Sequence, residues 1–126
     1  MSYRTHDISV VGGTLHVAEW GNGAGPIILC SHGLTATHIC WQALADVLAD
    51  VLGDGFRLIA PDHRGRGKSR DIKGPFGMLA HADDMVAILD HFGIAKADVM
   101  IGHSMGGFVA TVAGANYPDR FGKLLL

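Results

Sequence analysis

The pentapeptide Gly102-His103-Ser104-Met105-Gly106 decides the fold of this chain. It fits the pattern G-x-S-x-G, in which a serine stands on a sharp turn between a strand and a helix. The apolar run 97–101 before it indicates a strand, and the run 107–113 after it indicates a helix. Glycines on both sides of the serine leave room where a Cβ would clash with neighbouring backbone. The turn is therefore expected to expose the serine hydroxyl, on strained backbone, beside the free N–H groups of a helix N-terminus.

The rest of the chain alternates between strand and helix patterns. An antiparallel hairpin is expected first, because segments 8–11 and 14–20 alternate apolar and polar side chains around Gly12-Gly13. Further strands are expected at 26–30, 56–60 and 121–126, and helices at 41–52 and 78–92. This order predicts an α/β fold, with a mostly parallel, doubly wound sheet that opens with an antiparallel hairpin.

Two further motifs follow the strands expected at 26–30 and 56–60. Ser31-His32-Gly33-Leu34 comes after the first strand, and the stretch 62–69 (DHRGRGKS) comes after the second. The carboxyl ends of parallel strands meet at one edge of a sheet, where open α/β sheets bind their ligands. The two motifs and the serine turn are therefore expected to form one site.

Together, the H-G turn, the D-x-R-G-x-G-x-S loop and the G-H-S-M-G-G turn resemble the α/β-hydrolase family, in its serine-nucleophile, esterase-like branch. The resemblance covers nearly all of residues 1–126, but only the N-terminal part of the family's single catalytic domain. It implies that Ser104 is the nucleophile and that the backbone N–H groups of Met105 and Leu34 form the oxyanion hole. The residues that the resemblance assigns to structural support of the site are His32, Gly33, Gly102 and Gly106. His32 belongs to the oxyanion turn on this view and is not the catalytic base.

The family's catalytic acid, catalytic histidine and lid have no counterpart within residues 1–126, because in that family they follow later strands. Three explanations stay open. A C-terminal polypeptide of a cleaved or split enzyme supplies these parts, the sequence is truncated or incomplete, or the chain is a short protein that binds without turnover. The run 123–126 (KLLL) has no feature that protects an exposed sheet edge, which favours the first two explanations.

The sequence therefore predicts a serine hydrolase that cleaves a small carboxylic ester, or a related carbonyl compound, through an acyl-enzyme on Ser104. The isolated 126-residue chain is expected to be inactive. Dehalogenase and epoxide-hydrolase chemistry is disfavoured, because those branches of the family use aspartate in place of the serine. The alternative is a non-catalytic, hydrolase-like binding or interaction module, or an inactive truncated fragment.

Other polar residues of the motifs indicate structural roles. Asp62 is expected to accept hydrogen bonds from backbone N–H groups, and Arg64 to tie its loop down. His38 and His63 are interpreted as hydrogen-bonded or solvent-facing side chains near the pocket. The basic stretch 64–70 is interpreted as a solvated turn, and a phosphate-binding loop is excluded because Asp62 stands where that loop needs glycine. The remaining histidines without an indicated role are His6, His16, His81 and His91.

Composition excludes several classes of partner and cofactor. The net charge of −2 gives no broad attraction to nucleic acid, and no apolar run is long enough to span a membrane. No zinc-ligand spacing and no cofactor fingerprint occurs, so neither a metal nor a cofactor is expected. Cys30 and Cys40 are expected to be free thiols, which is typical of a cytoplasmic protein. Residues 1–7 contain no signal-peptide core.

Overall fold

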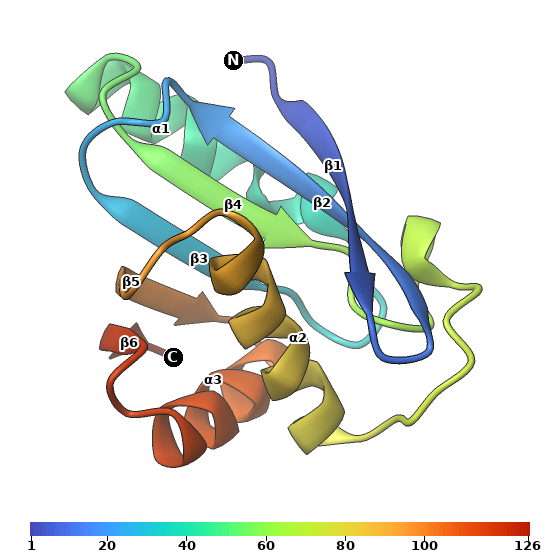
Figure 1. Cartoon of the computed structure of the whole chain (residues 1–126). Coiled ribbons are helices and arrows are strands. Elements are labelled where there is room, and N and C mark those ends of the chain that lie inside the picture. The colour runs from blue at the N-terminus through green and yellow to red at the C-terminus, as the bar shows by residue number, and fades with distance from the viewer.

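Six strands form one sheet in the order β1-β2-β4-β3-β5-β6 (Figure 1). The structure, a computed structural model, describes residues 1–126. The strands are β1 (Arg4–Val10), β2 (Gly13–Gly21), β3 (Ile27–Ser31), β4 (Arg57–Pro61), β5 (Ala97–Gly102) and β6 (Phe121–Leu125). The helices are α1 (Gln42–Leu52), α2 (Met78–His91) and α3 (Met105–Asn116), with short 3-10 turns η1 (His38–Trp41) and η2 (Gly67–Ser69). Strands β1 and β2 pair antiparallel, as do β2 and β4, and all other pairs are parallel. This topology confirms the predicted fold class.

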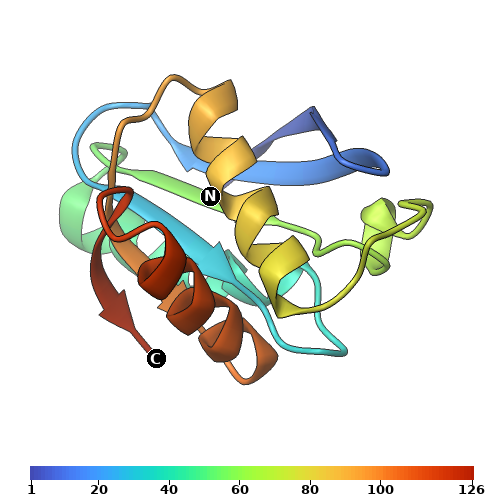
Figure 2. The same cartoon turned by 60° about the horizontal axis from the view of Figure 1, so that its bottom comes forward.

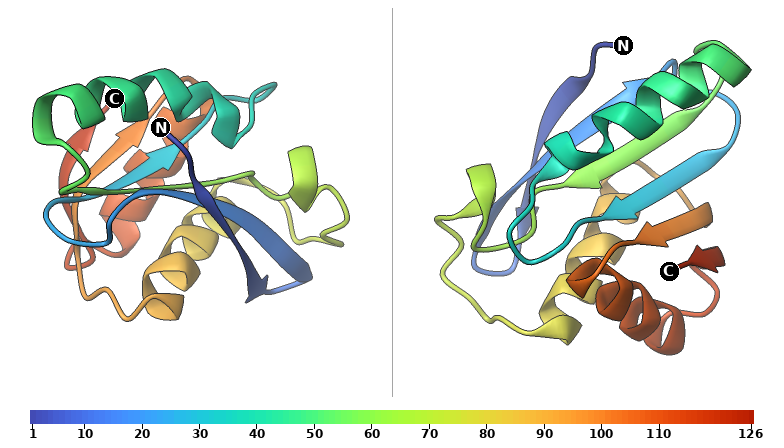
Figure 3. Two further views of the ribbon diagram at one scale, coloured as in Figure 1. Left: turned by 90° about the horizontal axis from the view of Figure 1, so that it is seen from above. Right: turned by 180° about the vertical axis from the view of Figure 1, so that it is seen from behind.

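Helices cover both faces of the sheet, with α1 on one side and α2 and α3 on the other (Figures 2 and 3). The central strands bury both of their faces, so successive side chains enter different cores. Ile28 and Cys30 of β3 join Leu58 of β4 in the core beneath α1. Leu29 and Ile59, which point the opposite way, pack in the larger core beneath α2 and α3. This alternation explains why the sequence shows continuous apolar runs at these strands.

The hairpin begins earlier than its sequence pattern indicates. Strand β1 starts at Arg4, whose partner in β2 is Glu19, whereas apolar alternation begins only at Ile8. The first residues of β1 that pair with β2 have polar side chains. Among them, His6 has its Nε2 3.0 Å from a carboxylate oxygen of Glu19. Such cross-strand polar pairs stabilise a sheet edge without leaving an apolar signal in the sequence.

The parallel strands bring the three motifs together. Strands β3, β4 and β5 all end at the same edge of the sheet, and register places Ser31 beside Gly102. The N–H of His103 donates to Ser31 O over 3.1 Å, which joins the turn after β3 directly to the turn after β5. At the far side of β5, the edge strand β6 exposes Leu124 and Leu125.

The expectation of free thiols also holds. Both cysteines are free thiols, with Cys30 buried and Cys40 exposed. Helix α2 is followed by Gly93 in the left-handed region, with φ of 66°, which is the usual way for a glycine to stop a helix. None of the helices combines the length and the apolar character that crossing a bilayer requires.

Candidate active site

Ser104 occupies the strained turn that the sequence predicts. It directly follows β5 and precedes α3, and its φ of 56° and ψ of −121° make it the one non-glycine residue with positive φ. Such a conformation costs on the order of 1–3 kcal/mol and persists only where the surroundings enforce it. Here the glycines enforce it by close backbone contact. A Cβ on Gly102 would lie 2.3 Å from Gly106 O, and one on Gly106 would lie 1.8 Å from Ser31 O.

The serine side chain is exposed and its hydroxyl makes no hydrogen bond within the chain. Two backbone donors beside it are also unused, because the Leu34 N–H has no acceptor and Met105 is the first residue of α3, whose N–H has no partner within the helix. Leu34, Ser104 and Met105 line one open cleft of about 680 Å³. Gly33 allows this approach, since a Cβ there would lie only 3.3 Å from the Cβ of Ser104. The cleft therefore places the exposed Ser104 hydroxyl close to the backbone N–H groups of Leu34 and Met105.

His32 supports the turn after β3 and cannot serve as a base. Its Nδ1–H donates to Gly33 O over 2.7 Å, and its Nε2 accepts the His63 N–H over 2.9 Å. Burial lowers the pKa of His32, which keeps the imidazole neutral so that Nε2 can accept this bond. Both ring nitrogens are therefore engaged by backbone groups.

His81 lines the cleft, although its sequence context suggested no role. It is buried on α2, and burial together with the charges of Arg66 and Arg64 lowers the pKa of His81 to about 4. A general base works best with a pKa near the working pH, so this imidazole is poorly suited to activate Ser104. A signal was present in the sequence, because His81 lies three residues after Met78 on the apolar stripe of its helix.

Residues 26–126 match the model of a family that is described as the alpha/beta hydrolase fold. The chain belongs to this family. The strand order, the serine turn and the helix after it are the parts of an alpha/beta hydrolase that the chain contains.

Individual alpha/beta hydrolases resemble the chain along most of its length. An epoxide hydrolase of Caballeronia sordidicola is 36% identical over 120 residues, which cover 94% of this chain and 35% of that protein. A bifunctional esterase/perhydrolase of Acinetobacter calcoaceticus is 34% identical over 101 residues, which cover 80% of this chain and 35% of that protein. The solved structure of the epoxide hydrolase CorEH superposes with a TM-score of 0.86 at 27% identity, covering 98% of this chain and 41% of that one. The chain thus spans well under half the length of these relatives.

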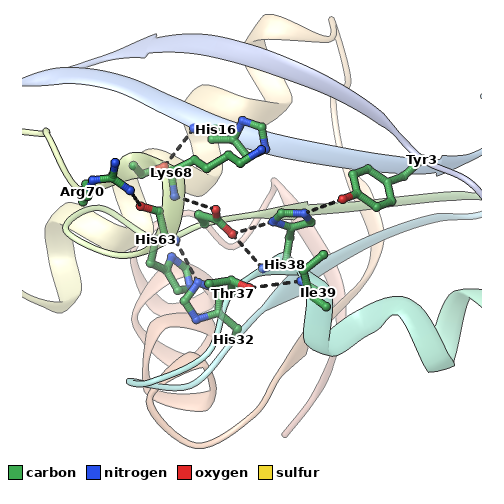
Figure 4. A network of polar contacts seen from close by, with 12 residues as sticks. Tyr3, His16, His32, Thr37, His38, Ile39, His63, Lys68 and Arg70 are labelled. Atoms are coloured by element: carbon green, nitrogen blue, oxygen red, sulfur yellow. Dashed lines mark hydrogen bonds and ion pairs between the residues drawn. The ribbon is translucent and has the colours of Figure 1, made fainter.

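Asp62 organises the loop after β4 through a polar network, in which its partners His38 and Lys68 are labelled in Figure 4. Its carboxylate accepts the backbone N–H groups of His38 and Lys68, at 2.8 Å and 2.9 Å, and lies 2.7 Å from His38 Nδ1. Burial alone would raise the pKa of Asp62, but these hydrogen bonds outweigh it and lower the pKa overall. The far nitrogen of His38 reaches the Tyr3 hydroxyl over 3.2 Å. The network ties three distant segments of the chain together beneath the site.

The same network contains a group with metal-ligand chemistry that spacing in the sequence does not reveal. Ligand atoms of His16, His38 and Asp62, all buried, lie within 4.8 Å of one another. Both nitrogens of His38 and both carboxylate oxygens of Asp62 already have protein partners, whereas Nε2 of His16 has none. We therefore assign this group a structural role in the loop.

Arg64 corrects one interpretation of the basic stretch. Its side chain is 1% exposed, so this part of the stretch is not a solvated turn. Its guanidinium donates to both carboxylate oxygens of Asp84 on α2, at 2.7 Å and 2.6 Å, and to the carbonyl groups of Pro75 and Val11. The expected role of tying the loop down is thus carried out through an ion pair with α2, which sequence alone did not identify.

Proposed function

We propose that the chain is the nucleophile-bearing, N-terminal part of a serine hydrolase, and that the complete protein cleaves a small carboxylic ester. The observation that carries this proposal is the exposed hydroxyl of Ser104 on strained backbone, beside the unused N–H groups of Leu34 and Met105. A packed structural serine has no need of such a conformation. Strain at a single exposed residue is typical of functional sites.

In the proposed reaction, Ser104 Oγ attacks the ester carbonyl carbon and gives its proton to a histidine. The negative oxygen of the tetrahedral intermediate accepts the N–H groups of Leu34 and Met105, at the positive end of α3. Collapse of the intermediate expels the alcohol, which takes the proton back from the histidine. Water, activated by the same histidine, then hydrolyses the acyl group from Ser104. Removing one oxyanion donor of this kind typically slows turnover by about 10²–10³-fold.

The proposed base and acid come from outside residues 1–126. Within the chain, His32 uses both ring nitrogens for backbone contacts, and the low pKa of His81 makes it a weak base. No imidazole of the chain is hydrogen-bonded to the Ser104 hydroxyl. The greater length of the relatives supports a C-terminal polypeptide that supplies the acid, the histidine and a lid. On this proposal, residues 1–126 alone do not turn over substrate.

The identity of the nucleophile favours an ester over an epoxide, although an epoxide hydrolase is among the relatives. Opening an epoxide with a carboxylate gives an ester adduct, which water can hydrolyse. Opening one with the Ser104 hydroxyl would give an ether, which has no carbonyl carbon for water to attack. An acyl-enzyme on Ser104 is hydrolysable, and the esterase/perhydrolase relative supports this reaction class.

Labelling with a fluorophosphonate probe tests the proposal on the protein together with any polypeptide that co-purifies with it. We expect covalent labelling that is lost in Ser104→Ala and kept in Ser9→Ala, a matched control on the exposed part of β1. Absence of labelling, or equal labelling of Ser104→Ala, contradicts the proposal. A stable monomer of 126 residues that unfolds cooperatively and is not labelled would instead support a non-catalytic binding module.

A further inference from the structure

The cleft beside Ser104 has an uneven distribution of polarity. Its apolar lining consists of Leu34, Phe76, Met78, Met105 and Phe108. Arg66 is the only charged residue among those that line it, and it approaches from the loop after β4. No carboxylate lines the cleft. The positive charge of this guanidinium therefore faces a mostly apolar space that also contains the serine hydroxyl.

The guanidinium of Arg66 is held in place by neutral groups. Its Nε donates to Leu34 O over 3.0 Å, and its Nη1 donates to Arg64 O over 3.0 Å. The same Nη1 lies 3.5 Å from His81 Nε2, which can act as an acceptor because the low pKa of His81 keeps it neutral. Nη2 makes no hydrogen bond within the chain. The group is thus fixed in position with one end free for a ligand.

The charge of Arg66 is uncompensated, unlike that of every other arginine that is not exposed. Arg57 pairs with Glu19, Arg64 with Asp84 and Arg120 with Asp90. Arg66 is half-buried and forms no ion pair. Partly buried charges are normally paired, because desolvation without a partner is unfavourable. An unpaired guanidinium fixed at the wall of a cleft is suited to bind an anion, and its planar fork matches a carboxylate.

We propose that Arg66 forms a carboxylate subsite, and that the ester cleaved at Ser104 carries a carboxylate on the part of the molecule that faces this arginine. The inference rests on the proposed function, because it places the subsite relative to the nucleophile. The apolar lining suits a short hydrocarbon spacer between the two groups. A monoester of a short dicarboxylic acid has this chemistry, whereas its neutral diester lacks the charge.

Binding of monomethyl glutarate and dimethyl glutarate tests the subsite without any need for turnover. Both are titrated against the Ser104→Ala protein, with the dissociation constants measured by calorimetry or NMR. We expect the monoester to bind about tenfold more tightly than the diester, and expect this preference to weaken as salt is added. Arg66→Gln should abolish the preference. Arg70→Gln, in the same loop but exposed and outside the cleft, should keep it.

Each outcome decides the inference separately from the proposed function. Equal binding of the two esters, no detectable binding of either, or a preference that survives in Arg66→Gln overturns the carboxylate subsite. A retained fold in Arg66→Gln, measured by circular dichroism, makes loss of the preference attributable to the missing charge. Fluorophosphonate labelling of Ser104 without a carboxylate preference refutes only the subsite. A carboxylate preference without labelling refutes only the proposed hydrolysis.

Discussion

Acid should destabilise this protein well before its carboxylates are protonated, because three buried histidines resist protonation in the folded state. Burial lowers the pKa of His32 and of His81, and lowers that of His63 still further below its ordinary value. Above about pH 6.5 these imidazoles are neutral in both states, so they contribute no pH dependence. Below that pH, the unfolded chain takes up protons that the folded chain does not, and the free energy of unfolding falls.

The magnitude follows from the linkage relation, which gives about 1.4 kcal/mol per pH unit for each proton. For His81, a fall of the pKa from 6.5 to about 4 corresponds to roughly 3 kcal/mol lost between neutral pH and pH 4. All three histidines together would steepen the loss to at most about 4 kcal/mol per pH unit below pH 6. Over one or two pH units, a loss at this rate is comparable to the whole free energy of unfolding of a small domain, which is about 5–15 kcal/mol.

Urea unfolding, followed by tryptophan fluorescence between about pH 7 and pH 4.5, measures this slope. The variant His81→Leu should reduce this slope by about 1.4 kcal/mol per pH unit, the contribution of one proton. The variant His91→Gln, which removes an exposed imidazole, serves as the matched control. A free energy of unfolding that stays level down to pH 4.5 would refute the assignment of these histidines as neutral, buried groups. So would a slope that His81→Leu leaves unchanged.

Two further predictions concern the groups that hold the site in shape. Gly106→Ala should lower the free energy of unfolding in denaturant by at least about 3 kcal/mol, because the new Cβ would lie 1.8 Å from Ser31 O. The control Gly107→Ala should be neutral or slightly stabilising, because its Cβ meets only ordinary contacts. Similar losses of stability in the two variants would contradict this prediction. Arg64→Met should cost about 3–5 kcal/mol, because it leaves the buried Asp84 unpaired, and adding Asp84→Leu should recover most of that loss. The prediction about this ion pair fails if a double-mutant cycle shows no coupling between the two positions.

The elements around the serine turn could be predicted from the sequence because their signals are local. Continuous apolar runs identified the central strands, a 3.6-residue period identified α2, and glycine spacing identified the turn at Ser104. One of the close contacts that enforce the strain at Ser104 is also local, since a Cβ on Gly102 would meet the carbonyl oxygen of Gly106 in the same turn. Local structure is therefore predictable where the interacting residues lie within one short segment.

The polar interior could not be predicted in the same way, because its partners come from distant segments. Arg64 lies in a basic stretch that resembles a solvated turn, and only folding brings it to Asp84 on α2. Asp62 joins His38 across the sheet edge by the same kind of long-range contact. The charge of Arg66 is informative for the opposite reason, since the folded chain offers it no partner. A local sequence pattern does not distinguish a charged side chain in a buried ion pair from one in a hydrogen-bonded network or one without a partner.

Detection of a covalent acyl-enzyme would show whether Ser104 is the nucleophile. The protein, with any polypeptide that co-purifies with it, is mixed briefly with p-nitrophenyl acetate, quenched in acid and analysed by intact-mass and peptide mass spectrometry. We expect the added mass of one acetyl group on the peptide that contains Ser104, and none in Ser104→Ala. Ester turnover that leaves Ser104 unmodified, or acetylation that persists in Ser104→Ala, would contradict it.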